Sequence, residues 1–301
     1  MIKSLNKQLD VLFVSPDSST KAYQELAKTY AAIETPTWAL LLAQACRSNG
    51  FEAAILDSGA ERLTLEQSVQ RIDEANPRLV CLTVYGQNPN SGTTNMIGAI
   101  ALARSLKVSY PEYKIAIVGS HVSALPLEVL SEDSIDYVLL NEGVYAVQNL
   151  LRSNLDDEVE KVKGIGHKQH NRPWLNPPEP VVPQDRMDLD LPGYAWDLLP
   201  YDKRPLDLYR AHFWHAEFDH AKRTPFAAIY TSLGCRFACD FCMINIVNRE
   251  DNEEGINSSH SRNMRFWSPD FITKEFEKLS NLGVETLRIS DEMFFLDKRY
   301  F

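Results

Sequence analysis

Short apolar runs alternate with longer amphipathic stretches along the first 150 residues of the chain. Such runs predict buried strands, and the stretches between them have the apolar spacing of helices. The predicted strands are 9–14, 53–56, 79–84, 114–118 and 137–140, and the predicted helices are 38–47, 65–75, 93–109, 125–131 and 144–152. Strands that alternate with helices in this way form a parallel sheet covered on both faces. We therefore predict a flavodoxin-like (Rossmann-like) α/β domain with five parallel strands.

Local signals mark the ends of the first crossover helix. Thr35 followed by Pro36 predicts an N-cap and a first-turn proline, and Asn49-Gly50 predicts the end of the helix. The sequence therefore defines this helix by its ends as well as by its apolar spacing.

From about Asp156 to Arg204 the chain becomes rich in proline and mixed charges, a composition typical of an extended connector. Within this segment, residues 162–174 are a candidate hairpin. After it come a strand over 226–231, a helix over 269–282 that Ser268-Pro269 begins, and a strand over 286–290. The predicted division is a first domain, a proline-rich connector and the start of a (β/α) barrel, over 1–155, 156–205 and 206–301. We expect the barrel to be incomplete, because two strands leave their edges unpaired.

Composition excludes several classes of protein. The 301 residues are 44% hydrophobic and 24% charged, which is ordinary for a folded globular chain, and the net charge is -10. Duplex nucleic acid and anionic membranes are held by clustered Lys and Arg, which the chain lacks, so neither is an expected partner. No apolar run is long enough for a membrane span or a secretory signal, so we expect a cytoplasmic protein. Cys46 and Cys81 lie in apolar stretches and are expected to be buried hydrophobes.

Open parallel sheets bind ligands beyond the carboxyl ends of their strands. The loops at that edge give the candidate binding residues, and their glycines have the alternative role of serving tight turns. No G-x-G-x-x-G or Walker lysine follows the first strand, so a dinucleotide or a nucleoside triphosphate is not expected. The candidates are Ser15, Tyr85, Gly86, Gln87, Gly119, Ser120, Asn141, Glu142 and Gly143.

Three cysteines lie in one short loop directly after the predicted strand over 226–231. They are Cys235, Cys239 and Cys242, in the pattern C-x-x-x-C-x-x-C. Three thiolates are one fewer than the four ligands of a structural zinc site or an ordinary iron–sulfur site, so the pattern predicts a metal with one open position. Zinc is the alternative, but neither His220 nor His260 lies at zinc-finger spacing from the cysteines.

The cysteine pattern, with Phe241 before its last cysteine, resembles the cluster loop of the radical S-adenosylmethionine (SAM) enzymes. The preceding domain resembles the cobalamin-binding domain of the largest subgroup of that family, through Gly119-Ser-His-Val-Ser-Ala-Leu-Pro126 and Ile135-Asp-Tyr-Val-Leu-Leu-Asn-Glu-Gly143 and their order before the cysteines. The chain lacks the Asp-x-His-x-x-Gly loop of classical cobalamin mutases, so we expect no histidine from residues 15–20 beneath the cobalt. His121 is the nearest candidate, and its alternative role is that of a solvated or capping residue.

The resemblance implies three cofactors: a [4Fe–4S] cluster on the three cysteines, SAM and cobalamin. The cobalamin would lie among the candidate residues of the sheet edge. Phe241 matches a position near the adenine of SAM, with a role in the loop core as the alternative. Asp291 and Glu292 replace the Gly-Gly-Glu of many members, and one of them is expected to bind the methionine amino group. Arg265 resembles a basic residue common before the first barrel helix, and its role is open.

The resemblance also implies an activity: reductive cleavage of SAM to a 5′-deoxyadenosyl radical, most simply for methylation of a substrate carbon. Ring formation, rearrangement, a non-catalytic cobalamin or iron–sulfur module, and a flavin-binding domain are the alternatives. A small-molecule, lipid or natural-product-like substrate and an electron donor such as flavodoxin or ferredoxin are the implied partners. A second metal site formed by His212, His215, Glu217, Asp219 and His220 is disfavoured, because these residues share no helical face.

Overall fold

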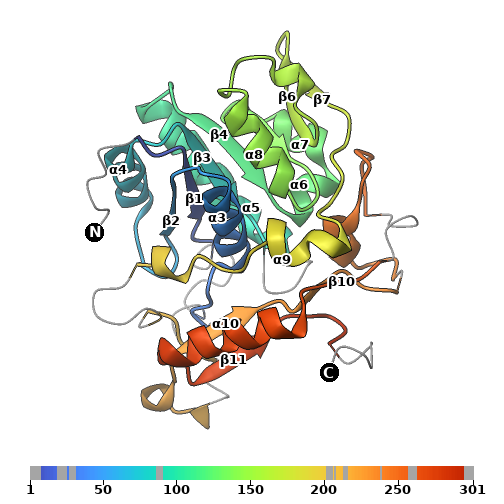
Figure 1. Ribbon diagram of the computed structural model, residues 1–301. Coiled ribbons are helices and arrows are strands. Elements are labelled where there is room, and N and C mark those ends of the chain that lie inside the picture. The colour runs from blue at the N-terminus through green and yellow to red at the C-terminus, as the bar shows by residue number, and fades with distance from the viewer. Residues whose placement is uncertain are drawn as a thin grey trace.

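A sheet of seven strands forms the centre of the larger part of the molecule (Figure 1). The computed structural model describes residues 8–18, 26, 32–85, 91–200, 206, 208–212, 216–237, 239–256 and 263–294. The strands are β1 (Val11–Ser15), β2 (Ala53–Asp57), β3 (Leu79–Thr83), β4 (Lys114–Val118), β5 (Tyr137–Leu139), β6 (Ile165–Gln169) and β7 (Arg172–Leu175). β1 to β5 are parallel and lie in the order β2-β1-β3-β4-β5. This is the flavodoxin-like order, so the predicted fold class is confirmed.

The predicted number of strands in the sheet was wrong, because the chain adds a hairpin at one edge. β6 pairs antiparallel with β5, and β7 pairs antiparallel with β6. The candidate hairpin within the proline-rich segment therefore forms, but as part of the main sheet and not as a separate element. Gly166 permits this pairing, since a Cβ atom there would lie 2.7 Å from side-chain atoms of Leu130 and Val138.

Helices cover both faces of the sheet, as the alternating pattern predicts. The helices are α3 (Thr37–Ser48), α4 (Leu65–Ala75), α5 (Gly92–Ser109), α6 (Ser120–Ala124), α7 (Pro126–Leu130), α8 (Val144–Arg152), α9 (Met187–Asp190) and α10 (Pro269–Asn281). α3 and α8 share one hydrophobic core with one face of the sheet, and α4, α5 and α7 share another core with the opposite face (Figure 1). No helix in the described ranges is both long and apolar enough to cross a membrane.

Two helix boundaries differ from the prediction. The helix predicted over 125–131 is α7, in which Pro126 takes the first turn, and the short helix α6 that precedes it was not predicted. Pro36 and not Thr35 is the N-cap of α3, so the predicted cap was wrong. The Thr35 hydroxyl instead accepts a hydrogen bond from the backbone N–H of Ala228, at 3.1 Å, far along the chain.

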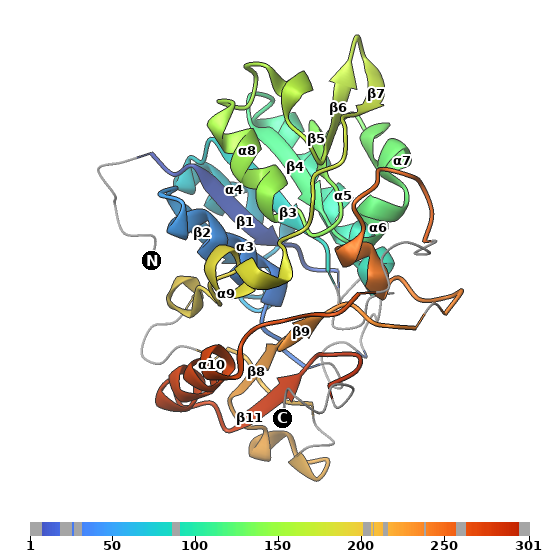
Figure 2. The same ribbon diagram turned by 45° about the vertical axis from the view of Figure 1, so that its right-hand side comes forward.

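The smaller part of the molecule follows residue 206 and contains the predicted start of a barrel. β8 (Phe226–Ile229) and β11 (Thr286–Ile289) are parallel neighbours, and α10 lies against them (Figure 2). β9 (Ser232–Leu233) and β10 (Arg265–Phe266) form a short antiparallel pair beside the cysteine loop. The two strands and the helix predicted for this region are thus present.

The two parts are packed together through a shared core. One cluster of buried side chains includes residues of α3 and the sheet together with Ala227, Ile229, Trp267 and Leu279 of the smaller part. Tyr194, from the proline-rich segment, donates a hydrogen bond to the carbonyl oxygen of Tyr230 at 2.8 Å. The domain boundaries at 155 and 205 stay a prediction, although the segment between them supplies both strands and core residues.

Candidate cofactor site

A narrow crevice lies between the carboxyl edge of the parallel sheet and the cysteine loop. The larger part lines it with Trp38, Tyr85 and Ser120, and the smaller part lines it with Tyr230, Ser232, Leu233, Gly234, Met243, Ile244, Val247 and Glu292. Its volume is about 20 Å³, which is room for a single water molecule. A larger ligand therefore enters only when lining side chains or loops at the rim move.

Three aromatic rings cross the crevice from one part to the other. The Trp38 and Tyr85 rings are stacked with centroids 4.5 Å apart, and the Trp38 and Tyr230 centroids are 6.3 Å apart. The Tyr85 hydroxyl donates to the carbonyl oxygen of Asn141 at 2.7 Å. Burial raises the pKa of Tyr85 well above its ordinary value, so the phenol stays neutral. These contacts give the crevice an aromatic wall.

The other predicted residues of the sheet edge lie in different surroundings. Ser15 ends β1, and its carbonyl oxygen accepts the N–H of Ser58 at 3.0 Å. The Asn141 backbone N–H donates to the Ser123 hydroxyl at 2.7 Å, while the Asn141 side chain donates to the carbonyl oxygen of Asp251 at 3.1 Å. Gly86 and Gln87 lie outside the described residues. Their roles as cobalamin contacts stay predictions.

The described glycines of this edge are required by the packing of the chain itself. A Cβ atom on Gly119 would lie 2.4 Å from the carbonyl oxygen of Val84. Gly143 has φ +73°, and a Cβ atom there would lie 2.9 Å from a methyl group of Val118. These positions favour the alternative role, in which the glycines serve turns, over a role in direct binding.

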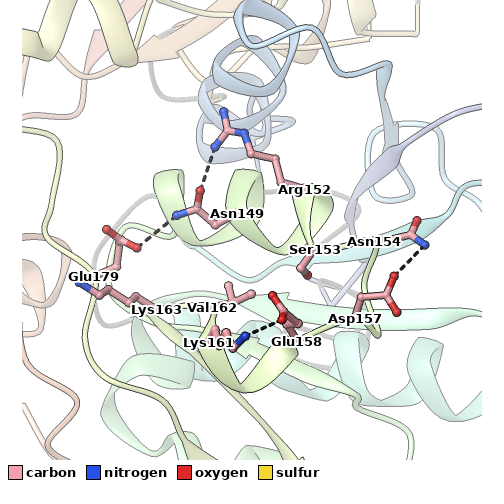
Figure 3. A pocket seen from close by; sticks show the side chains of 10 residues that line it. All are labelled: Asn149, Arg152, Ser153, Asn154, Asp157, Glu158, Lys161, Val162, Lys163 and Glu179. Carbon is pink, nitrogen blue, oxygen red and sulfur yellow. Dashed lines mark hydrogen bonds and ion pairs between the residues drawn. The ribbon is translucent and has the colours of Figure 1, made fainter.

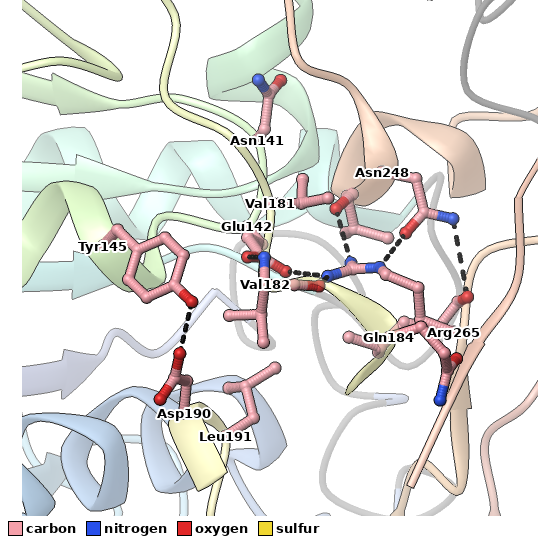
Figure 4. Close-up of polar contacts among 12 residues, drawn as sticks. Asn141, Glu142, Tyr145, Val181, Val182, Gln184, Asp190, Leu191, Asn248 and Arg265 are labelled. Carbon is pink, nitrogen blue, oxygen red and sulfur yellow. Dashed lines mark hydrogen bonds and ion pairs between the residues drawn. The ribbon is translucent and has the colours of Figure 1, made fainter. Parts of the chain in front are cut away.

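Glu142 forms a buried ion pair with Arg265 that joins the two parts (Figure 4). The Arg265 Nη1 donates to Glu142 Oε2 at 2.9 Å, and the Val182 backbone N–H donates to Glu142 Oε1 at 2.5 Å. Burial raises the pKa of Glu142, and the Arg265 guanidinium partly offsets that rise. Both carboxylate oxygens thus have protein partners, which is a different role from the predicted cofactor contact.

Asn245, from the segment that follows the cysteine loop, forms two hydrogen bonds to the backbone of that loop. The Asn245 side chain accepts the backbone N–H of Cys235 at 3.0 Å and donates to the carbonyl oxygen of Phe237 at 2.9 Å. Cys235 is buried, Cys239 is exposed and Cys242 is half-buried. Within the described ranges, no three cysteine, histidine or acidic side chains lie ready to hold a metal ion. Three thiols are the donor type of an iron–sulfur cluster, and their role as its ligands stays a prediction.

The two acidic residues after β11 have separate surroundings. Asp291 accepts hydrogen bonds at 2.6 Å from the backbone and hydroxyl of Thr231 and from the hydroxyl of Ser232. Glu292 lines the crevice beside Tyr230 and Met243. Burial raises the pKa of each carboxyl group. Phe241 is 76% exposed, so its alternative role in the loop core was wrong.

The histidines form no second metal site in the described part of the chain. His212 Nε2 lies 3.0 Å from Glu34 Oε1, while Glu217 pairs with Lys222 at 2.7 Å. His215 and His260 lie outside the described residues. Thr93 Oγ1 lies 3.1 Å from His121 Nδ1, and burial lowers the pKa of His121, which favours its neutral form.

A wider pocket of about 560 Å³ lies at the far end of α8, away from the cysteine loop (Figure 3). Charged and amide side chains line it, and several of them bond to one another, such as Arg152 to Asn149 and Lys161 to Glu158. The end of α8 lies at the amino edge of the parallel strands, where open sheets do not bind ligands. The crevice is therefore the better candidate despite its smaller volume.

Comparisons with known proteins find relatives of both the sequence and the fold. Residues 25–151 match the B12 binding domain family. The match supports cobalamin binding by this part of the chain. The chain is also 25% identical over 254 residues to an uncharacterized methyltransferase of Pyrococcus horikoshii, covering 82% of this chain and 47% of that relative.

Two solved structures share the fold over almost the whole chain. The radical SAM methyltransferase TsrM from Kitasatospora setae, with cobalamin and a [4Fe–4S] cluster bound, has a TM-score of 0.62 at 16% identity, over 98% of this chain and 49% of that one. The cobalamin-dependent SAM radical enzyme OxsB has a TM-score of 0.57 at 13% identity, over 94% of this chain and 34% of that one. The resemblance inferred from the sequence is confirmed at the level of fold. The chain spans about half the length of the P. horikoshii methyltransferase and of TsrM.

Several residues of the site could not be found from the sequence. Trp38 lies in an apolar helix and Tyr230 directly follows an apolar strand, and an aromatic residue at such a position is expected in any core. Asn245 carries a weak signal, since a buried asparagine three residues after a cysteine needs polar partners. Only the fold brings Trp38 and Tyr230 to the same crevice.

Proposed function

We propose that the protein is part of a cobalamin-dependent radical SAM enzyme that methylates a carbon atom of its substrate. The observation that carries the proposal is the crevice in which the carboxyl edge of a B12-family sheet faces a loop of three cysteines. A donor set of three thiols, with a fourth iron position left to a ligand, distinguishes such a loop from a closed structural site.

Cys235, Cys239 and Cys242 would hold the cluster. When bound, the cluster supplies the electron that cleaves SAM to methionine and a 5′-deoxyadenosyl radical. The chain itself supplies the geometry: Asn245 fixes the first cysteine, and Gly234 lets the backbone turn into the loop at φ +89°. The aromatic wall of Trp38, Tyr85 and Tyr230 would exclude water from the reacting atoms.

Glu292 is the better of the two acidic candidates for the amino group of SAM. Its carboxyl group borders the crevice, whereas the oxygens of Asp291 are occupied by Thr231 and Ser232. Asp291 would instead tie the end of β11 to the strand that leads into the cysteine loop. Replacement of Glu292 by Gln should therefore weaken SAM binding, while Asp291→Asn should lower stability.

Cobalamin would lie over the carboxyl edge of the sheet, between Tyr85, Ser120 and the cysteine loop. Residues 16–18 of the first loop are Pro, Asp and Ser, so this part of the loop has no histidine that would ligate the cobalt. His121 is already paired with Thr93, which agrees with a cobalt that takes no histidine from this edge.

The test is anaerobic reconstitution of the complete natural protein with iron, sulfide and cobalamin. We expect about four irons per chain, the visible bands of bound cobalamin, and formation of 5′-deoxyadenosine from SAM with a reductant. Replacement of all three cysteines by Ala should abolish the cluster and the cleavage but leave cobalamin bound. Cleavage by the triple variant would refute the proposal, and binding of both cofactors without cleavage would favour a non-catalytic module.

A low-potential electron donor such as a flavodoxin or ferredoxin, a reducing cytoplasm and a small-molecule or lipid-like substrate complete the proposal. Reduced thiols are kept in a reducing compartment, which suits a cluster loop of free cysteines. The net charge of -10 gives no basic surface for nucleic acid.

A further inference from the structure

Arg265 lies where three segments of the chain meet, and its guanidinium bonds to all of them (Figure 4). It donates to Glu142 Oε2 at 2.9 Å and to the carbonyl oxygen of Val182 at 2.7 Å. It also donates to the Asn248 side chain at 2.9 Å and to the carbonyl oxygen of Val247 at 3.1 Å. Only 6% of the Arg265 side chain is exposed, so these contacts are made away from solvent.

On one side these contacts lead to the cysteine loop. The Arg265 backbone pairs with Leu233, two residues before Cys235. Asn248, which accepts from Arg265, donates in turn to the carbonyl oxygen of Asn263 and packs against Gly234. Arg265 therefore contacts both β9, which precedes the cysteine loop, and the short 3-10 helix Ile244–Asn248, which follows it.

The contact of Arg265 with Glu142 leads to the carboxyl edge of the parallel sheet. Glu142 lies in the loop between β5 and α8, beside Asn141 and Gly143. Its second oxygen accepts the N–H of Val182, so the same carboxylate also fixes the segment that crosses between the two parts. One ion pair thus connects the sheet edge to the strand pair that leads into the cysteine loop.

A planar guanidinium suits this role better than a lysine would. Arginine presents several donors in a fixed plane, so four contacts in different directions determine its position completely. Buried ion pairs contribute little to net stability, because desolvation of both charges offsets their attraction. Their clearer effect is to permit one arrangement of the surrounding chain and to disfavour the others.

We propose that Arg265 is a positioning residue that sets the distance between the cobalamin at the sheet edge and the cluster on the cysteine loop. The proposal rests on the proposed function, since it needs both cofactors. It assigns to Arg265 a role that its sequence pattern alone leaves open. Glu142 is its partner in that role.

The test measures the distance between the two cofactors in the complete natural protein. With cob(II)alamin and the reduced cluster both bound, pulsed electron paramagnetic resonance gives the distribution of distances between the two paramagnets. We expect one narrow distribution in the natural protein, and a broader or displaced one in Arg265→Gln and in the milder Glu142→Gln. The control is Arg104→Gln, which breaks an exposed pair with Glu132 on the surface. An unchanged distribution in both test variants, with full iron and cobalamin content, would overturn the proposal.

A second measurement needs no cofactor. Cys235 is 7% exposed, so its alkylation in the metal-free protein reports how often the loop opens. We expect Arg265→Gln and Glu142→Gln to speed this alkylation about tenfold or more, at a temperature where circular dichroism shows each variant folded. Unchanged rates would count against the role of the pair. Failure of the natural protein to bind both cofactors would instead refute the proposed function, whatever the alkylation rates.

Discussion

Asp57 is a buried carboxyl group at the carboxyl end of β2. Its oxygens accept the Tyr209 hydroxyl at 2.9 Å and the Ala60 backbone N–H at 3.1 Å. Burial nevertheless dominates and raises the pKa of Asp57 from 3.8 to about 6. The folded chain therefore binds this proton more tightly than the unfolded chain does.

This shift predicts a specific dependence of stability on pH. The stabilisation from protonated Asp57 is complete below about pH 3.8 and is lost as the pH rises to about 6. Relative to Asp57→Asn, the natural chain should lose about 3 kcal/mol of unfolding free energy across that window. Urea unfolding from pH 4 to 8 measures the difference, with the exposed Asp133→Asn as control. A constant difference between the natural chain and Asp57→Asn would contradict the prediction.

Gly234, directly before the first cysteine, cannot accept a side chain. Its φ is +89°, and a Cβ atom would lie 1.7 Å from Asn248 Nδ2 and 2.5 Å from the carbonyl oxygen of Asn263. Gly283 is a matched control, since its φ is +85° and no atom lies within 4 Å of its Cβ position. Gly283→Ala should lower the free energy of unfolding by about 1 kcal/mol from backbone strain alone. Gly234→Ala should cost about 3 kcal/mol or more because the clash is added. Equal losses in urea unfolding would show that the contact with Asn248 is unimportant.

At the scale of the elements, the sequence predicted most of the fold because each strand and helix carries its own periodic signal. α4 is the clearest case, since it begins and ends within one residue of the predicted range and has a capping box of Thr64 and Gln67. The hairpin of β6 and β7 was placed correctly along the chain but not in space. Its pairing with β5 places Gly166 close to Leu130 and Val138, a contact that no local pattern encodes.

The cap of α4 gives a quantitative prediction. Thr64 Oγ1 accepts the Gln67 N–H at 3.2 Å, and the Gln67 side chain accepts the Thr64 N–H at 2.9 Å. Thr64→Ala leaves the Gln67 N–H without its side-chain acceptor and should lower the free energy of unfolding by about 1 kcal/mol. Thr64→Ser keeps the hydroxyl and should cost less than half as much. Urea unfolding of the two variants measures this, and equal losses would argue against the capping bond.

The candidate site was only partly predictable, because some of its residues carry a local signal and others meet only after folding. The three cysteines and Tyr85 are recognisable because their chemistry or their place after a strand is visible locally. The partners of Glu142 and Asp291 were missed, since Arg265 and Thr231 are distant in sequence and meet them only after folding. An acidic residue at a strand end looks the same whether it binds a ligand or another segment of the chain.

For the molecule as a whole, the shared core implies that the two parts unfold together. Thr35, which is 1% exposed, joins them by accepting the Ala228 N–H. We expect one thermal transition, with coincident curves from circular dichroism and tryptophan fluorescence. Thr35→Val should lower the free energy of unfolding by about 1–3 kcal/mol, because it leaves the buried Ala228 N–H without an acceptor. Thr35→Ser is the control that keeps the oxygen. Two separate transitions would contradict the shared core.

The hairpin at the edge of the large sheet also governs how copies of the chain behave toward one another. Its outer strand, β7, is only four residues long and contains Pro173, which has no N–H to offer, beside the exposed Arg172. A strand from another chain would have few hydrogen-bonding groups to pair with there, because a short edge strand with a charge and a proline disfavours strand addition. Removal of this hairpin would uncover β5, whose three side chains are all buried, and we expect the shortened protein to aggregate more readily.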